Sequence, residues 1–249
     1  PDYSRRVAVL TSQAPGARIV DIQRSANQQL LKNSLSALSS FEGQRTLLEG
    51  LNSLAMQVNG ADNAPSPAKL IGQLQESLHL FSSTPSNRLL AENVVEAARQ
   101  VALNLNQGTQ ALQTARTEAD LAIAAEVADL NTLLADFHEA NKAVIAGELS
   151  GKDVSDAYDQ RDGLLKKISE KMPVTTLTRA GNDMVILTKD GNMLYETVPR
   201  TVTFEPLPGY SPGTTGNAIY VDGVPVSGGM GGNTTASGRI AGLIQLRDT

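Results

Sequence analysis

The sequence predicts a mainly α-helical protein with a small β domain, an α+β fold. In it an elongated bundle of long antiparallel helices carries a β-rich module inserted before the C-terminal helix. Three observations support this prediction. Residues 86–147 lack proline and repeat apolar side chains every three or four positions, which predicts one long amphipathic helix. Short segments rich in Thr and Val follow Pro173, as expected of strands. A helical apolar pattern then returns at residues 239–247.

The long helix is the organising element of the predicted fold. At 1.5 Å per residue it would span roughly 90 Å, which exceeds the width of a compact domain of this size. Its spacing is mostly heptad, but steps of four between Ala115 and Val127 favour a straighter bundle over a left-handed supercoil. The predicted apolar stripe, which we expect to pack on other helices of this chain or its neighbours, comprises Val94, Ala98, Val101, Leu105, Gly108, Leu112, Ala115, Ala119, Ile123, Val127, Leu130, Leu134, Phe137 and Val144.

The N-terminal third is predicted to pass from extended to helical structure. Residues 5–22 alternate apolar and polar side chains around a Pro15-Gly16 turn, which indicates a hairpin or a loose arm. Residues 23–58 then follow a helical pattern. Gly43 and Gly50 each weaken that helix by up to about 1 kcal/mol, so we expect it to bend there.

Further elements complete the predicted organisation. Short helices are expected at residues 66–83 and, begun by Asp153 or Ser155, through Lys171. Asp190-Gly191 and Asp222-Gly223 are strong hairpin signals. The predicted division is an arm or hairpin at 1–22, a helical rod at 23–171, a small β domain at 172–237 and a return helix of the rod at 238–249.

Composition excludes several classes of protein. The net charge of −5 gives no basic surface for nucleic acid, and no Lys- and Arg-rich amphipathic face suits an anionic membrane. The absence of cysteine excludes disulfides, Fe-S clusters and thiolate zinc sites. No run of eighteen apolar residues occurs and no signal peptide opens the chain, so we expect export without a cleaved leader or a leader already removed.

A search for chemistry leads to the prediction that the protein is not an enzyme, with no catalytic, cofactor-binding or metal site and no cofactor. His79 and His138 lie on different helices without a partner at metal-ligand spacing. The glycines at 228–232 lack the Lys-Ser/Thr of a phosphate-binding loop, so we interpret them as a linker. Asp153, Asp156, Asp159 and Asp162 could suggest calcium, but no Gly and closing Glu follow, and we interpret them as a capped, solvated helix face.

Four stretches resemble a known family, in the same order along the chain. Residues 1–6 resemble the Thr-Pro-Gly-Tyr-Ser-Arg-Arg segment of flagellar rod, hook and hook-associated proteins, with Asp2 where Gly is usual. Residues 16–24 are similar to the entry of the first core helix in the hook-filament junction family, hook-associated protein 1. More specific are Asp159-Gln160-Arg161-Asp162 with the following Leu164-Leu165, and the Gly-x-Ile-x-Gly-Leu-x-x-x-Arg-Asp pattern at 238–248.

The resemblance implies a structural component of the bacterial flagellum that polymerises head to tail between hook and filament, outside the cell, after export through the flagellar secretion channel. It implies as partners other copies of the chain, hook protein, the next hook-associated protein and an export chaperone, with no nucleic acid or membrane. It also implies that this chain is a core fragment lacking both terminal polymerisation segments. Arg5, Arg6, Arg161 and Asp162 are candidates for subunit contacts, although salt bridges within the rod explain them equally well.

Two alternatives remain open at the level of sequence. Another axial protein, such as hook, a rod component or the third hook-associated protein, shares the opening motif and the helical core, but not the block at 159–162. A secreted coiled-coil adhesin or effector with a ligand-binding β tip would also have a long rod, but it would form no polymer.

Overall fold

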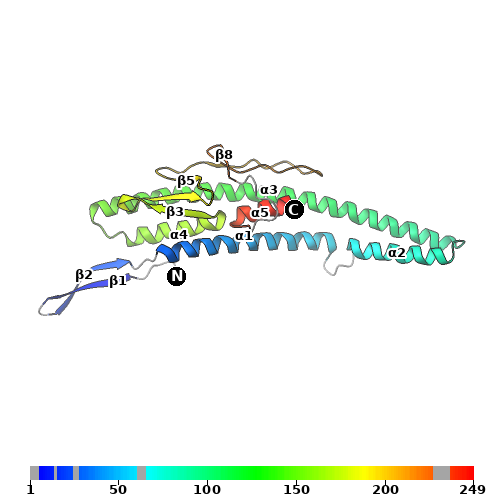
Figure 1. The fold of residues 1–249 in the computed structure, drawn as a ribbon, viewed down its shortest axis with the longest axis horizontal. Coiled ribbons are helices and arrows are strands. Elements are labelled where there is room, and N and C mark those ends of the chain that lie inside the picture. The colour runs from blue at the N-terminus through cyan, green and yellow to red at the C-terminus, as the bar shows by residue number, and fades with distance from the viewer. Residues whose placement is uncertain (1–5, 14–15, 25–27, 61–65, 227–235) are drawn as a thin grey trace.

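The protein is an elongated rod built around one helix, α3, in a computed structural model that describes residues 6–13, 16–24, 28–60, 66–226 and 236–249 (Figure 1). Helix α3 (Arg88–Ser150) has 63 residues and runs along most of the molecule. It begins where the Asn87 side chain accepts hydrogen bonds from two backbone N–H groups, and it ends at Gly151 in the left-handed conformation. The long helix is therefore confirmed as the organising element.

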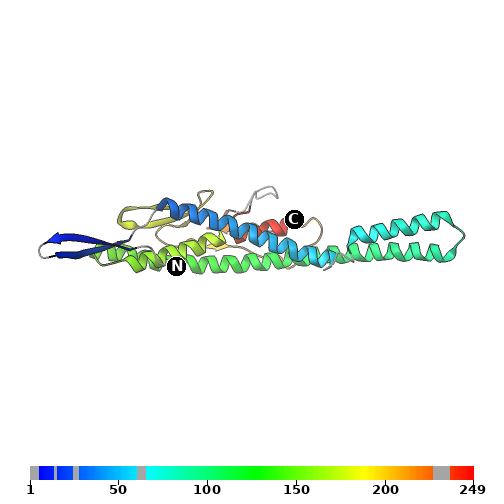
Figure 2. The same ribbon diagram turned by 90° about the horizontal axis from the view of Figure 1, so that it is seen from below.

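Two helices lie end to end along α3. Helix α1 (Gln28–Asn59) covers the body of the rod, and α2 (Pro67–Ser83) pairs with α3 beyond the end of α1 (Figure 2). The Ser66 side chain caps α2 by accepting a hydrogen bond from the Lys69 N–H, with Pro67 at the first helical position. At the far end of the rod α2 and α3 are the described elements that remain, as an antiparallel helical hairpin.

The β structure consists of a hairpin and two small antiparallel sheets. The predicted N-terminal hairpin is confirmed as β1 (Arg6–Gln13) and β2 (Gly16–Arg24). After helix α4 (Ser155–Lys171), the strands β3 (Val174–Thr178), β4 (Met184–Thr188) and β5 (Met193–Tyr195) form one sheet. The strands β6 (Val202–Thr203), β7 (Tyr220–Val221) and β8 (Val224–Pro225) form the other.

Both predicted Asp-Gly turns are present. Gly191 has φ 86° and Gly223 has φ 80°, which is the left-handed geometry such turns require. Helix α5 (Arg239–Asp248) then returns to the rod between α1 and α3 (Figure 1). A short 3-10 turn, η1 (Ala180–Asn182), connects β3 to β4. The fold is mainly α with a small β module before the C-terminal helix, as predicted.

One hydrophobic core joins the helices to both sheets. The C-terminal half of the predicted α3 stripe is buried as expected, from Ala119 to Val144. It packs with buried residues of α1, α4, both sheets and α5, among them Leu35, Leu165, Ile186, Val202 and Ile240.

The N-terminal half of the predicted stripe is partly wrong. Ala98 is exposed, and Leu105 is 49% exposed. Val94 and Val101 are half-buried as predicted, and the buried position that the prediction missed is Asn104. The physical reason is that beyond the end of α1, which reaches α3 at Gly108, α2 is the one described helix beside α3, and a single partner helix covers a narrow arc of its surface.

Two details of α1 also differ from the prediction. The helix begins at Gln28 instead of residue 23, because β2 continues to Arg24. Gly43 and Gly50 are where α5 lies against α1, a packing role that the sequence did not predict. A Cβ at Gly43 would lie 2.7 Å from the Ala236 carbonyl oxygen, and a Cβ at Gly50 would overlap the Leu246 side chain.

Gly242 of α5 faces Gly43 across this contact. A Cβ at Gly242 would lie 2.6 Å from the Gly43 carbonyl oxygen, so we expect Gly242→Ala to force the two helices apart. Overpacking of this kind costs about 1–3 kcal/mol of the free energy of unfolding, which urea denaturation measures. Gly72→Ala in α2 is the control, because nothing lies within 4 Å of a Cβ there. That substitution should stabilise the protein by about 0.5–1 kcal/mol, and equal effects of the two would contradict this account.

Candidate functional site

Three polar side chains of α3 hold the irregular chain that follows α4, and they are the centre of the candidate functional site. Asp120 and Asn141 are fully buried, and Asn131 is half-buried. Each side chain replaces hydrogen bonds that a neighbouring backbone segment would otherwise make to water. A buried polar group needs such partners, since leaving it unpaired costs about 1–3 kcal/mol. The β module is therefore fixed to α3 at defined points along its length.

Asn141 makes four hydrogen bonds to three other segments. Its Nδ2 donates to Asp183 Oδ1 at 2.8 Å and to the Tyr195 hydroxyl at 3.3 Å. Its Oδ1 accepts from Arg161 NH1 at 2.9 Å and from the Met184 N–H at 3.2 Å. This one side chain joins α3 to α4, to the start of β4 and to β5, and its hydrogen-bonding capacity is fully used.

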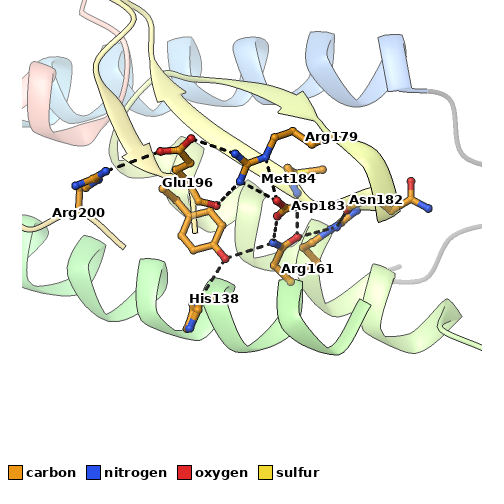
Figure 3. A network of polar contacts seen from close by, with 10 residues as sticks. His138, Arg161, Arg179, Asn182, Asp183, Met184, Glu196 and Arg200 are labelled. Carbon is orange, nitrogen blue, oxygen red and sulfur yellow. Dashed lines mark hydrogen bonds and ion pairs between the residues drawn. The ribbon is translucent and has the colours of Figure 1, made fainter. Parts of the chain in front are cut away.

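The network continues to the surface through charged groups (Figure 3). Arg179 donates from Nε to Asp183 Oδ2 and from NH1 to Glu196 Oε1, each at 3.0 Å. The buried Arg161 also donates to the Asn182 carbonyl oxygen at 2.7 Å. These bonds connect the η1 turn to α4 through Arg161 and to the end of β5 through Arg179 and Glu196.

Tyr195 and His138 form the aromatic side of the same network (Figure 3). The Tyr195 hydroxyl lies 3.1 Å from His138 Nδ1, and the Tyr195 ring meets Phe137 edge to face at 5.1 Å between centroids. Burial raises the pKa of Tyr195 above its usual value, so the hydroxyl stays neutral and can donate a hydrogen bond. The contacts of His138 are those of a packed structural residue.

Asn131 fixes the second sheet in a similar way. Its Nδ2 donates to the Val202 carbonyl oxygen at 2.8 Å, and its Oδ1 accepts from the Val202 N–H at 3.0 Å. Both backbone groups of this residue of β6 are thereby paired with α3. The Asn131 side chain thus supplies this two-residue strand with backbone hydrogen bonds that its own sheet does not make.

Asp120 anchors the C-terminal helix and the long loop before β7. Its Oδ1 accepts from Arg247 NH1 at 3.1 Å, and its Oδ2 accepts from the Leu207 N–H at 2.8 Å and the Tyr210 hydroxyl at 2.9 Å. Arg116 donates to the Arg247 carbonyl oxygen at 2.8 Å and stacks over the Tyr210 ring at 4.2 Å. Both partners of the Arg247–Asp120 ion pair are buried, so removal of one would leave an uncompensated charge.

The Gly-x-Ile-x-Gly-Leu-x-x-x-Arg-Asp pattern at 238–248 now has a physical explanation. Gly238 has φ 81°, and a Cβ there would lie 2.6 Å from the Lys171 carbonyl oxygen. Ile240 is buried in the core, and Gly242 allows the close approach to α1. Arg247 reaches Asp120, as described above. The pattern describes how α5 fits between α1, α3 and α4.

The structure places the residues singled out from the sequence in different environments. His79 is exposed on α2, far along the chain from His138, and the two are not part of one site. Asp159 is buried, so the four aspartates at 153–162 do not share one solvated face; Asp153 instead accepts a hydrogen bond from the Ser155 N–H. Arg161 is an internal anchor. Arg5, the side chain of Arg6 and the glycines at 228–232 lie outside the described residues.

Sequence reasoning missed Asp120, Asn131 and Asn141. The available signal was position: Asn141 interrupts the apolar stripe between Phe137 and Val144, where a polar side chain must find partners inside the protein. Within the described part of the chain, no group of three or more His, Cys, Asp and Glu side chains could hold a metal ion. None of the described helices is long and apolar enough to cross a membrane.

Comparison with known proteins identifies the family to which this chain belongs. The model of the flagellar hook-associated protein FlgK helical domain matches residues 60–249. The chain belongs to the FlgK helical-domain family. This family is one of structural proteins of the flagellum, so the FlgK-type chain described here is a flagellar structural component.

A solved structure shares this fold. It is the flagellar hook junction protein FlgK from Burkholderia pseudomallei, with a TM-score of 0.63 and 16% sequence identity. The match covers 88% of this chain and 38% of that one, so the present chain spans well under half the length of that FlgK. A search of curated proteins found no match.

The central role of Asn141 in this FlgK-type domain can be tested with Asn141→Leu. The substitution keeps the volume but leaves the Met184 N–H and parts of Arg161 and Asp183 without their buried partner. We expect a loss of about 2–4 kcal/mol in the free energy of unfolding, measured by urea denaturation. The exposed Asn106→Leu on the same helix should change it by no more than about 0.5 kcal/mol. Equal losses in both variants would show that Asn141 is not an anchor.

The Tyr210–Asp120 contact predicts a loss of stability in alkali. Burial and the hydrogen bond to the Asp120 carboxylate raise the pKa of Tyr210 to about 12. In the unfolded chain a tyrosine loses its proton near pH 10, whereas in the folded protein Tyr210 keeps it. Its contribution is therefore complete below about pH 10 and is lost as the pH rises to about 12. Tyr210→Phe should flatten the fall in unfolding free energy across this window, and an unchanged pH profile would contradict the assignment.

Proposed function

We propose that this protein is an adaptor at the hook-filament junction of the bacterial flagellum, which polymerises head to tail and allows the filament to assemble on the hook. The observation that carries the proposal is the match of residues 60–249 to the FlgK helical domain. The fold shared with a flagellar hook junction protein supports it, although that likeness concerns the fold alone.

The shape of the molecule suits such a role. The two ends of the rod present different structures, a β hairpin beside the helices at one end and the bare α2–α3 hairpin at the other (Figure 2). Where one end of a rod contacts the unlike end of the next, the contact is heterologous, and such contacts generate rings or helical arrays. In this proposal residues 23–171 and 238–249 supply the subunit contacts, and the β domain at residues 172–237 faces outward.

The polar anchors give the adaptor its rigidity. Asp120, Asn131 and Asn141 fix the β module and α5 to one continuous helix, so the relative positions of the contact surfaces are set before assembly. A preorganised subunit loses less conformational entropy on joining a polymer, and so less of the contact energy is spent on ordering. The proposed partners are other copies of the chain, hook protein, the next hook-associated protein and an export chaperone. Its proposed location is the extracellular part of the flagellum, reached through the flagellar secretion apparatus without a cleaved leader.

Deletion of the gene tests the junction role. We expect cells that carry hooks without filaments, because the filament would lack the surface on which it grows, and we expect monomeric filament protein in the medium. Electron microscopy and an immunoassay of the medium measure the two effects, and the restored wild-type gene is the control. Loss of the hooks would place the protein earlier in the axial structure. Normal flagella would overturn the junction role and favour an adhesin-type rod.

A further inference from the structure

The far end of the rod joins its body at a place where one helix ends and another begins. Helix α1 ends at Asn59 and α2 begins at Pro67, so they are separate helices along α3 (Figure 2). The last turn of α1 lies opposite Gly108, where a Cβ would lie 3.7 Å from Val58 Cγ1. The described helix that runs unbroken past this gap is α3. We call α2 together with residues 88–103 of α3 the far hairpin.

The segment of α3 beside this gap has a low helix propensity. Residues 104–109 read Asn-Leu-Asn-Gln-Gly-Thr, and Asn, Gly and Thr each favour the helix less than Ala, Leu or Gln does. Gly108 is the one glycine of α3 before its last turn. The Thr109 hydroxyl donates to the Leu105 carbonyl oxygen at 2.9 Å, a kind of bond that often bends a helix. The local sequence therefore weakens α3 at this point.

Tertiary packing does little to compensate for this weakness. Of residues 105–110 all are exposed except Gly108, which is half-buried. The nearest buried residues of α3 on either side are Asn104 and Ala119. Most of the stability of a helix in a protein comes from the packing of one face, so a helix loses support where that face is uncovered. Weak propensity and weak packing thus coincide at residues 104–109.

The polar bonds of the far hairpin are local. Each side-chain hydrogen bond or ion pair that the described residues 66–103 make joins positions at most four apart, as between Arg88 and Glu92. In the body, by contrast, Arg116 and Asp120 of α3 bind segments distant in sequence. Among the described residues of the far hairpin, no bond of these kinds has to break for the hairpin to tilt.

We propose that residues 104–109 of α3 are a hinge about which the far hairpin tilts relative to the body of the rod. Changes of φ and ψ at a few hinge positions move a whole rigid unit. Residues 88–104 span about 25 Å, so a kink of about 20° moves the tip of the hairpin by roughly 8 Å. The hinge goes beyond the proposed function, because it belongs to the single chain. At a junction it would let copies adjust to two unlike surfaces while the polar anchors of the body stay intact.

A distance measurement between two spin labels tests the hinge. Because the chain contains no cysteine, Ser53→Cys in α1 and His79→Cys in α2 each take a nitroxide label at an exposed position. The two positions lie on either side of the gap between α1 and α2, so a tilt at the hinge changes their separation. Double electron–electron resonance on the full 249-residue chain should give a broad distribution of distances, because straight and tilted molecules are both present.

A stiffened variant combines Asn106→Ala, Gly108→Ala and Thr109→Ala in the labelled chain. Asn106 and Thr109 are exposed, and a Cβ at Gly108 makes an ordinary contact with Val58, so the straight form accepts all three changes. Because Ala favours the helix, the tilted population should fall roughly tenfold and the distribution should narrow. The matched control is Gly72→Ala in α2, where nothing lies within 4 Å of a Cβ, and it should leave the distribution unchanged.

Two results would overturn the hinge. A distribution in the unstiffened chain that is as narrow as that of the stiffened variant shows that α3 is rigid at residues 104–109. Equal narrowing by Gly72→Ala shows that the spread arises within α2 and not at the hinge. Circular dichroism confirms that each labelled chain folds. Because the measurement uses the purified chain, it decides the hinge whatever the deletion strain shows about the junction role.

Discussion

The rest of the structure depends on the continuity of α3. A helix of 63 residues cannot be stable in water through its own hydrogen bonds alone, so its length requires packing partners throughout. The chain supplies them unevenly. Helices α1, α4 and α5 and both sheets pack on its C-terminal part, and among the described elements α2 alone lies beside its N-terminal end. The body of the rod therefore has a true core, and the far end is a two-helix hairpin with large apolar side chains exposed on its surface.

The β module is held by specific polar bonds as well as by apolar burial. Its strands β6, β7 and β8 have two residues each and bury little surface, so they cannot set their own position on the rod. Asn131 pairs both backbone groups of Val202, and Asp120 and Asn141 fix the segments on either side of that strand. Buried polar groups that are fully paired favour one arrangement over its alternatives, because any shift would leave several of them unpaired.

Rigidity in the body of the rod suits the junction role that we propose. Contacts that are individually weak build an ordered array if each subunit presents its surfaces in a fixed geometry.

The sequence by itself determined the elements. Proline-free periodicity, Ser66-Pro67 and the two Asp-Gly turns are local signals, so the α-helices of the described part of the chain were predictable to within about five residues, whereas the 3-10 turn η1 was not predicted. Only the tertiary structure decided which faces are covered. Gly43 looked like a weakness in α1 and is a site of close packing; Leu105 looked like core and is exposed; Asn141 drew no attention and joins three segments. The physical reason is that periodicity shows that a helix has an apolar face, whereas burial depends on which elements distant in sequence arrive beside it.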